Sequence, residues 1–63
     1  MPFITVEAGS LSKDQKVSLA KNLTRTAAEV MELPEDAFIV FMKENSYDNI
    51  AAGGILLSER KEQ

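Results

Sequence analysis

The sequence predicts an α+β domain, in which a βαβ unit with a parallel two-stranded sheet and one amphipathic helix is followed by a short C-terminal hairpin. Three observations predict this fold. Residues 3–8 alternate in a strand-like pattern, an amphipathic segment follows Ser12, and residues 37–42 form a second, apolar run. Strands joined by a crossover helix lie parallel, and the crossover is right-handed. We therefore expect a single domain spanning 1–63.

The first two elements are a strand and the helix that crosses over from it. In residues 3–8, the even-numbered positions are apolar and many residues favour β structure. Ser12 and Gln15 have the spacing of a capping box, so the helix begins directly after Ser12. It ends by Glu32, because Pro34 disfavours the α conformation of the residue before it. The apolar stripe of this helix contains Val17, Leu19, Ala20, Leu23, Ala27, Ala28, Val30 and Met31.

The second strand is apolar on both of its faces. Residues 37–42 read Ala-Phe-Ile-Val-Phe-Met, a pattern typical of a strand that is buried on both sides. One helix can cover only one face of a two-stranded sheet, and an apolar face left open to water on a soluble protein marks an interface. A chain of 63 residues also buries too little surface to be more than marginally stable alone. The sequence therefore predicts an oligomer.

The C-terminal third is predicted to contain a loop, a hairpin and a tail. Residues 44–49 are polar and rich in turn formers, which predicts a surface loop. In residues 50–57, a pair of glycines separates two short apolar runs, which favours a tight hairpin or bulged ribbon. Residues 58–63 form a charged tail. Tyr47 lies in the polar loop, where a tyrosine is usually partly packed but can also offer its hydroxyl to a pocket or partner.

The composition excludes several classes of function. The chain has no cysteine and no histidine, which removes disulfides, thiol nucleophiles, Cys/His metal sites and histidine acid–base chemistry. Its net charge is −3 and its seven basic residues are scattered, which argues against nucleic acid as a partner. No apolar run approaches the ~20 residues of a membrane span, and no signal peptide is recognisable. We expect a soluble, cytoplasmic protein without a cofactor or a metal.

Pro2 is the strongest candidate for chemistry. If Met1 is removed, Pro2 carries the free α-amine of the chain, a secondary amine fixed to an ordered strand. Such an amine titrates near ~7.7–8.0, and an apolar setting lowers its pKa, so that it can act as a general base. The alternative interpretation is purely structural: Pro2 lacks an N–H and simply begins a strand.

Several features occur in a characteristic order along nearly the whole chain. They are the chain length, Met1-Pro2 before an alternating strand, a Ser-Lys-Asp-Gln-Lys helix start, Leu33-Pro34 before the second strand, and Gly53-Gly54 after a polar loop. With these features in this order, the chain resembles members of the 4-oxalocrotonate tautomerase family. The resemblance implies a βαβ subunit with a terminal hairpin, assembled as a homohexamer (a trimer of dimers) with active sites at subunit contacts. It also implies that Pro2 is a base moving a proton between oxygen and carbon of a small enol or 2-oxo acid.

The chain departs from the family at the residues that assist the proline. The first of two family arginines falls near Ser10 or Leu11, the second falls on Ile39, and a pocket aromatic falls on Ile50. Because these residues would line the site, Leu11, Ile39 and Ile50 are candidate substrate-binding residues. A guanidinium binds carboxylates and stabilises a developing oxyanion. The candidate replacements are Lys43, which shares a strand face with Ile39, as well as Lys13, Lys16 and backbone amides.

Three functions are consistent with these observations. The first is a keto–enol tautomerase or isomerase with Pro2 as general base. The second is a non-catalytic oligomeric scaffold that keeps the fold, an interpretation favoured by the missing arginines and by any retention of Met1. The third is a small module that binds an apolar or aromatic ligand.

Overall fold

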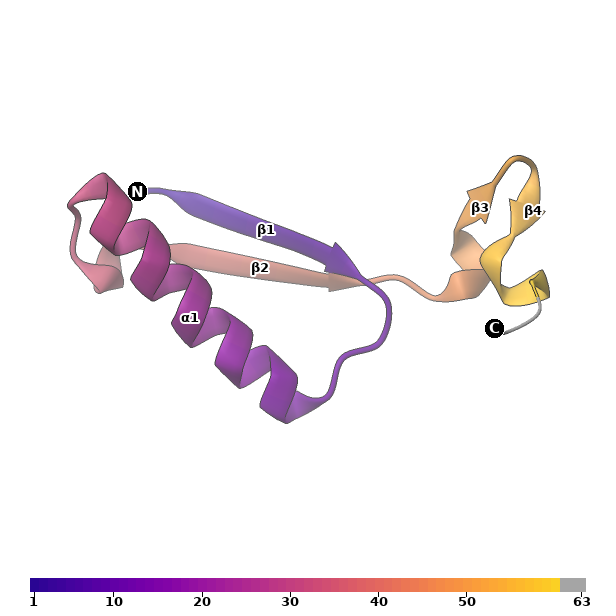
Figure 1. Ribbon diagram of the computed structural model, residues 1–63, viewed down its shortest axis with the longest axis horizontal. Helices are drawn as coiled ribbons and strands as arrows, with labels where there is room; N and C mark the ends of the chain where they lie inside the picture. Colours follow the sequence, from indigo (N-terminus) through magenta and orange to yellow (C-terminus); the bar gives the residue numbers. More distant parts are fainter. Residues whose placement is uncertain (61–63) are drawn as a thin grey trace.

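A parallel two-stranded sheet with one helix across it forms the body of the protein, and a small hairpin extends from it (Figure 1). The computed structural model describes residues 1–60. The helices and strands are β1 (Phe3–Ala8), α1 (Lys13–Met31), β2 (Ile39–Glu44), β3 (Ala51–Ala52) and β4 (Ile55–Leu56). Strands β1 and β2 are parallel, in a register that runs from Phe3 opposite Ile39 to Ala8 opposite Glu44. The predicted βαβ unit and C-terminal hairpin are therefore confirmed.

Local hydrogen bonds set both ends of α1. The Ser12 hydroxyl accepts from the Gln15 N–H (3.1 Å), and the Gln15 side-chain oxygen accepts from the Ser12 N–H (2.9 Å), so the predicted capping box is present. At the other end, Glu32 adopts a left-handed conformation with φ of 58°. The Leu33 N–H then turns back to the Ala28 carbonyl oxygen (3.1 Å). The helix ends where the proline after Leu33 requires it to end.

The two faces of the β1–β2 sheet differ in exposure. The even-numbered side chains of β1 and the apolar even-numbered side chains of β2 lie under α1 and are half-buried. On the opposite face, the rings of Phe3 and Phe41 stack with their centroids 5.9 Å apart, and they remain 62% and 49% exposed. Within residues 1–60, Ala28 alone is buried, and it retains 8% of its exposure. The open face is therefore apolar and uncovered in a single chain, as the sequence predicts.

Two sequence-based boundaries differ from the structure. The second strand was expected over 37–42, but β2 spans Ile39–Glu44, because Glu35–Ala37 form a turn of 3-10 helix instead. The N–H groups of Ala37 and Phe38 bond within that turn and are lost to the sheet. The predicted loop correspondingly begins one residue later, and Tyr47–Asn49 within it form another 3-10 turn.

The apolar stripe of α1 is longer than the strands of the sheet beneath it. Val17, Val30 and Met31 belong to the predicted stripe, yet they are exposed. The 19 residues of α1 extend ~28 Å at 1.5 Å per residue. Each six-residue strand extends only ~20 Å. The ends of the helix therefore lie beyond the sheet.

The C-terminal arm, residues 46–60, lies apart from the body (Figure 1). Gly53 and Gly54 both have positive φ, 62° and 85°, which suits the two central positions of a tight hairpin turn. Arg60 closes the arm by donating to the Ala52 carbonyl oxygen (2.9 Å). The Cα radius of gyration is 15.2 Å, against about 11 Å for a compact domain of this length. Of the predicted charged tail, residues 61–63 lie outside the described residues, and Leu57–Glu59 form a 3-10 turn.

Candidate active site

Pro2 is held at the start of β1 by its own carbonyl group. The Ile39 N–H donates to the Pro2 carbonyl oxygen (3.1 Å), and this bond belongs to the first pair of the parallel ladder, Phe3 opposite Ile39. Pro2 is half-buried, and Ile39, half-buried as well, lies beside it on the neighbouring strand. The backbone of Pro2 is therefore held at the amino end of the sheet, beside Ile39.

The other candidate substrate-binding residues do not meet Pro2 within one chain. Lys43 lies opposite Glu7 near the far end of the sheet, four residues along β2 from Ile39. Leu11 precedes α1, and its N–H bonds to the carboxylate at the end of β2. Ile50 lies in the C-terminal arm. Of the four predicted neighbours, the structure brings only Ile39 to Pro2 within one chain.

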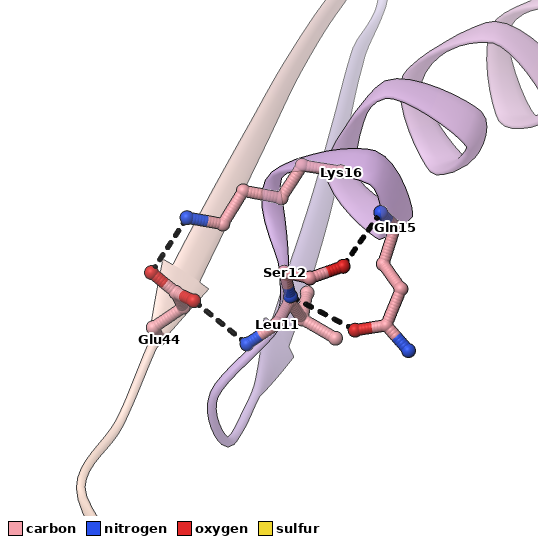
Figure 2. Close-up of polar contacts among 5 residues, drawn as sticks. All are labelled: Leu11, Ser12, Gln15, Lys16 and Glu44. Atoms are coloured by element: carbon pink, nitrogen blue, oxygen red, sulfur yellow. Dashed lines mark hydrogen bonds and ion pairs between the residues drawn. The ribbon is translucent and has the colours of Figure 1, made fainter.

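A charged cluster closes the carboxyl end of the sheet (Figure 2). The Glu44 carboxylate accepts from Lys16 Nζ (2.9 Å) at one oxygen and from the Leu11 N–H (2.8 Å) at the other. The hydrogen bond from Lys16 and then that from Leu11 lower the pKa of Glu44 below its ordinary value of 4.5. Lys16, one candidate replacement for the family arginines, is thus already paired, and the cluster ties the start of α1 to β2.

Tyr47 lies over the end of β1, in a position that sequence reasoning did not foresee. A Cβ atom placed on Gly9 would lie 3.1 Å from Tyr47 Cε1 and 3.6 Å from the hydroxyl oxygen. The two residues are 38 positions apart, and no periodic pattern connects them. The only available signal was a glycine at the end of a strand, which can mark a close approach of another group. Tyr47 also borders an open hollow with Ser10, Asn45 and Ser46.

The two arginines of the chain form hydrogen bonds with groups outside the β1–β2 sheet. Arg25 donates to the Asn22 side-chain oxygen on the outer face of α1 (2.9 Å), and Arg60 closes the hairpin. Among residues 1–60, no group of three or more Asp or Glu side chains is placed to hold a metal ion. Over the same part of the chain, no helix combines the length and apolar character that a membrane crossing needs.

Comparison with known proteins identifies the family. The model of the tautomerase enzyme family matches residues 2–60, which begin at Pro2 and include every element described above. The chain belongs to the tautomerase family. A probable tautomerase of Bacillus cereus is 34% identical over 61 residues, which are 95% of this chain and 100% of that protein. Membership of the tautomerase family supports a tautomerase-type activity.

Solved structures of tautomerase homologues share the fold. A 4-oxalocrotonate tautomerase homologue superimposes with a TM-score of 0.89 at 27% identity, over 98% of this chain and 100% of that one. A heterohexameric 4-oxalocrotonate tautomerase from Chloroflexus aurantiacus gives a TM-score of 0.81 at 23% identity, over 97% of this chain and 98% of that one. The extended arm of this tautomerase-family chain is thus included in both alignments.

Proposed function

We propose that this chain is a keto–enol tautomerase in which the Pro2 nitrogen, freed by removal of Met1, is the general base for an enol or 2-oxo acid substrate. The observation that carries the proposal is the placement of Pro2, which is bonded through its carbonyl to Ile39 (3.1 Å). The family match that begins at residue 2 supports it. Apolar neighbours disfavour the charged form of an amine, which favours a neutral base near pH 7.

The reaction needs one base and one stabilised oxyanion. The neutral Pro2 nitrogen takes the hydroxyl proton of the enol, which breaks the O–H bond and leaves an enolate. The same nitrogen then returns the proton to the carbon of the double bond, while the oxygen electrons form the ketone. The substrate is isomerised with no net gain or loss of protons, and Pro2 is regenerated as a neutral amine. A donor near the enolate oxygen accelerates both steps.

The pocket around Pro2 is proposed to be completed by a second copy of the chain, paired along β1. Strand β1 bonds to β2 on one edge, and no strand within residues 1–60 pairs with its other edge; such an edge readily pairs with another strand. Of the two outer edges, that of β1 lies farther from α1, because β2 lies between them (Figure 1). A two-fold axis normal to the sheet and midway between the two β1 strands makes a continuous four-stranded sheet with both helices on one face.

The alternation of side chains limits the register of this pairing. Residues opposite one another in an antiparallel pair point to the same face, so the helix-facing positions of β1 must oppose each other. An axis at a residue position satisfies this rule, and an axis at Thr5 or at Val6, the two positions nearest the centre of β1, gives the longest overlap of the two strands. Pro2 then lies opposite Ala8 of the partner subunit or Ser10 of the partner subunit. Either register brings the loop that contains Leu11 of the partner subunit towards Pro2.

Self-association beyond the dimer is proposed to bury the open face and the arm, and a homohexamer, as a trimer of dimers, accounts for both. The stacked rings of Phe3 and Phe41 need a cover, and the arm extends far enough to reach another subunit. Ile50 would enter a neighbour's site in this way, and Lys43 is the cation that lies on the same face as Ile39. The heterohexameric relative from Chloroflexus aurantiacus has the same subunit fold.

The test is the ketonisation of phenylenolpyruvate, followed by ultraviolet absorbance, for protein whose intact mass shows Met1 removed. Protein that retains Met1 has a tertiary amide at Pro2 and no base, so its kcat should be lower by the ~10²–10⁴-fold that general-base catalysis typically contributes. Pro2→Ala, which exchanges the rigid secondary amine for a primary amine, should also lower kcat. Pro34→Ala is the matched control, since it replaces the other proline of the chain, outside the site. The pH–rate profile of the processed protein should rise with pH as the base loses its proton, with an apparent pKa below the usual range of an α-amine. Full activity of Pro2→Ala, or none in the processed wild type, would show the proposal to be wrong.

A further inference from the structure

We infer that the hydroxyl of Tyr47 is the hydrogen-bond donor to the enolate oxygen, and that it acts on the substrate held by Pro2 of the partner subunit. This assignment rests on the proposed tautomerase function and on the pairing along β1. It gives a role to a side chain whose hydroxyl has no hydrogen-bond partner within residues 1–60. Tyr47 is the only tyrosine of the chain.

The position of Tyr47 is fixed by the backbone around it. The Asn45 N–H donates to the Ala8 carbonyl oxygen (2.8 Å), which holds the end of β2 against the end of β1. Ser46 then begins the 3-10 turn: its hydroxyl accepts from the Asp48 N–H (3.1 Å) and its carbonyl oxygen accepts from the Asn49 N–H (2.8 Å). These bonds hold the backbone of Tyr47 beside the end of β1, and its ring, which is 55% exposed, lies against Gly9. A donor that is in place before the substrate arrives is what oxyanion stabilisation requires.

Gly9 sets the distance at which the hydroxyl approaches the strand. The Tyr47 hydroxyl oxygen lies 3.6 Å from the point where a Cβ of residue 9 would stand, and the ring lies closer, at 3.1 Å. Gly9 does not have positive φ, so an alanine here meets no backbone strain. The absence of a side chain at Gly9 therefore matters for the tyrosine ring above it, rather than for the conformation of the chain.

The two-fold pairing brings this hydroxyl to the base of the other subunit. With the axis at Thr5 or Val6, Pro2 lies opposite the segment Ala8 to Ser10 of the partner subunit. Gly9 of the partner subunit is the middle of that segment, and Tyr47 of the partner subunit lies on it. The base and the donor would therefore come from different chains at each site.

The surroundings of Tyr47 are compatible with an anionic substrate, although Glu44 lies nearby. Glu44 lies beside the same hollow, but both of its oxygens are occupied, by Lys16 (2.9 Å) and by the Leu11 N–H (2.8 Å). Its charge is thus offset by that of Lys16. Ser10 and Ser46 supply further neutral polar groups at the border of the hollow. An enolate at this place meets a phenolic donor and no unpaired carboxylate from this cluster.

The first experiment removes the hydroxyl and leaves the ring. Loss of one oxyanion donor costs about 10²–10³ in kcat, so Tyr47→Phe should lower kcat for phenylenolpyruvate by about 100-fold with KM nearly unchanged. Ser18→Ala, which removes an exposed hydroxyl on the outer face of α1, should leave kcat at the wild-type value. Circular dichroism and sedimentation check that the fold and the assembly are retained. An unchanged kcat, with or without a change in KM, overturns the assignment.

A double-mutant cycle with Gly9 tests the position of the ring. Gly9→Ala should displace the tyrosine and lower kcat in the wild-type background. It should have no further effect when Tyr47→Phe is already present, because the donor has been removed. Equal losses in both backgrounds would show that Gly9 acts independently of the hydroxyl, and would contradict the assignment.

Mixed subunits test whether the base and the donor come from different chains. Pro2→Ala and Tyr47→Phe subunits are unfolded together and refolded as a one-to-one mixture. If the site is shared between chains, random mixing produces about a quarter of sites in which both Pro2 and Tyr47 are wild-type. If the site lies within one chain, no site has both groups. Recovery of activity supports the assignment, and no recovery in verified mixed assemblies overturns it. If Pro2→Ala alone is fully active, the proposed function fails, whereas an inactive Pro2→Ala with a fully active Tyr47→Phe overturns only this inference.

Discussion

Replacing Phe41 by alanine should weaken self-association without unfolding the subunit. About half of this side chain is exposed on the open sheet face, which is roughly 100 Å² for a ring that buries ~200 Å² when fully covered. At ~25 cal/mol per Å², covering that surface in an assembly stabilises each subunit by about 2.5 kcal/mol. The alanine variant also loses the stacking on Phe3.

Sedimentation velocity over a range of protein concentrations measures this effect. Because 1.4 kcal/mol is a factor of ten, Phe41→Ala should raise the concentration for half-dissociation by roughly 50-fold or more. Thr26→Ala, an exposed change on the outer face of α1, should leave that concentration unchanged. If Phe41→Ala assembles as tightly as the wild type, the open face is not the surface through which subunits associate.

Three further predictions concern stability. Ser12→Ala removes the hydroxyl that accepts from Gln15 (3.1 Å), and it should cost about 1 kcal/mol, measured by urea unfolding at fixed protein concentration; an unchanged midpoint would contradict the role of the cap. Gly54→Ala places a side chain at φ of 85°, and it should destabilise the arm by at least about 1 kcal/mol, in contrast to Ala52→Gly, which meets no such strain. Glu44 has a lowered pKa in the folded protein, so its contribution is present above its ordinary pKa of 4.5 and is lost as the pH falls through the lower folded value. Glu44→Gln should therefore reduce stability at neutral pH, and its difference from wild type should shrink in acid; a difference that is independent of pH would refute this linkage.

Features that depend on neighbours in the sequence could be predicted. The start of α1 follows from the spacing of Ser12 and Gln15, and its end follows from Pro34. Both ends of α1 are determined by residues within a few positions of them, which can be read from a single sequence. The expectation that Ile39 lies near Pro2 came instead from the family resemblance, and the register of β1 and β2 places the two residues on neighbouring strands.

Features that depend on distant contacts could not be predicted. The β2 boundary differs from the prediction because residues 35–37 take up their own hydrogen bonds in a 3-10 turn, which hydropathy does not reveal. The contact of Tyr47 with Gly9 joins a loop to a strand end without any shared pattern. The pairing of Lys16 with Glu44 likewise appears only when α1 and β2 are in place.

The near absence of a buried core changes what the melting temperature of this protein means. Ala28 alone is buried within residues 1–60, and the molecule extends 43 Å along its longest axis. Unfolding of such a chain and dissociation of its complex then become one equilibrium, so the apparent Tm depends on how much protein is present. We expect Tm to rise with every tenfold increase in protein concentration. We also expect a newly synthesised chain to become stably folded only after it associates with another copy.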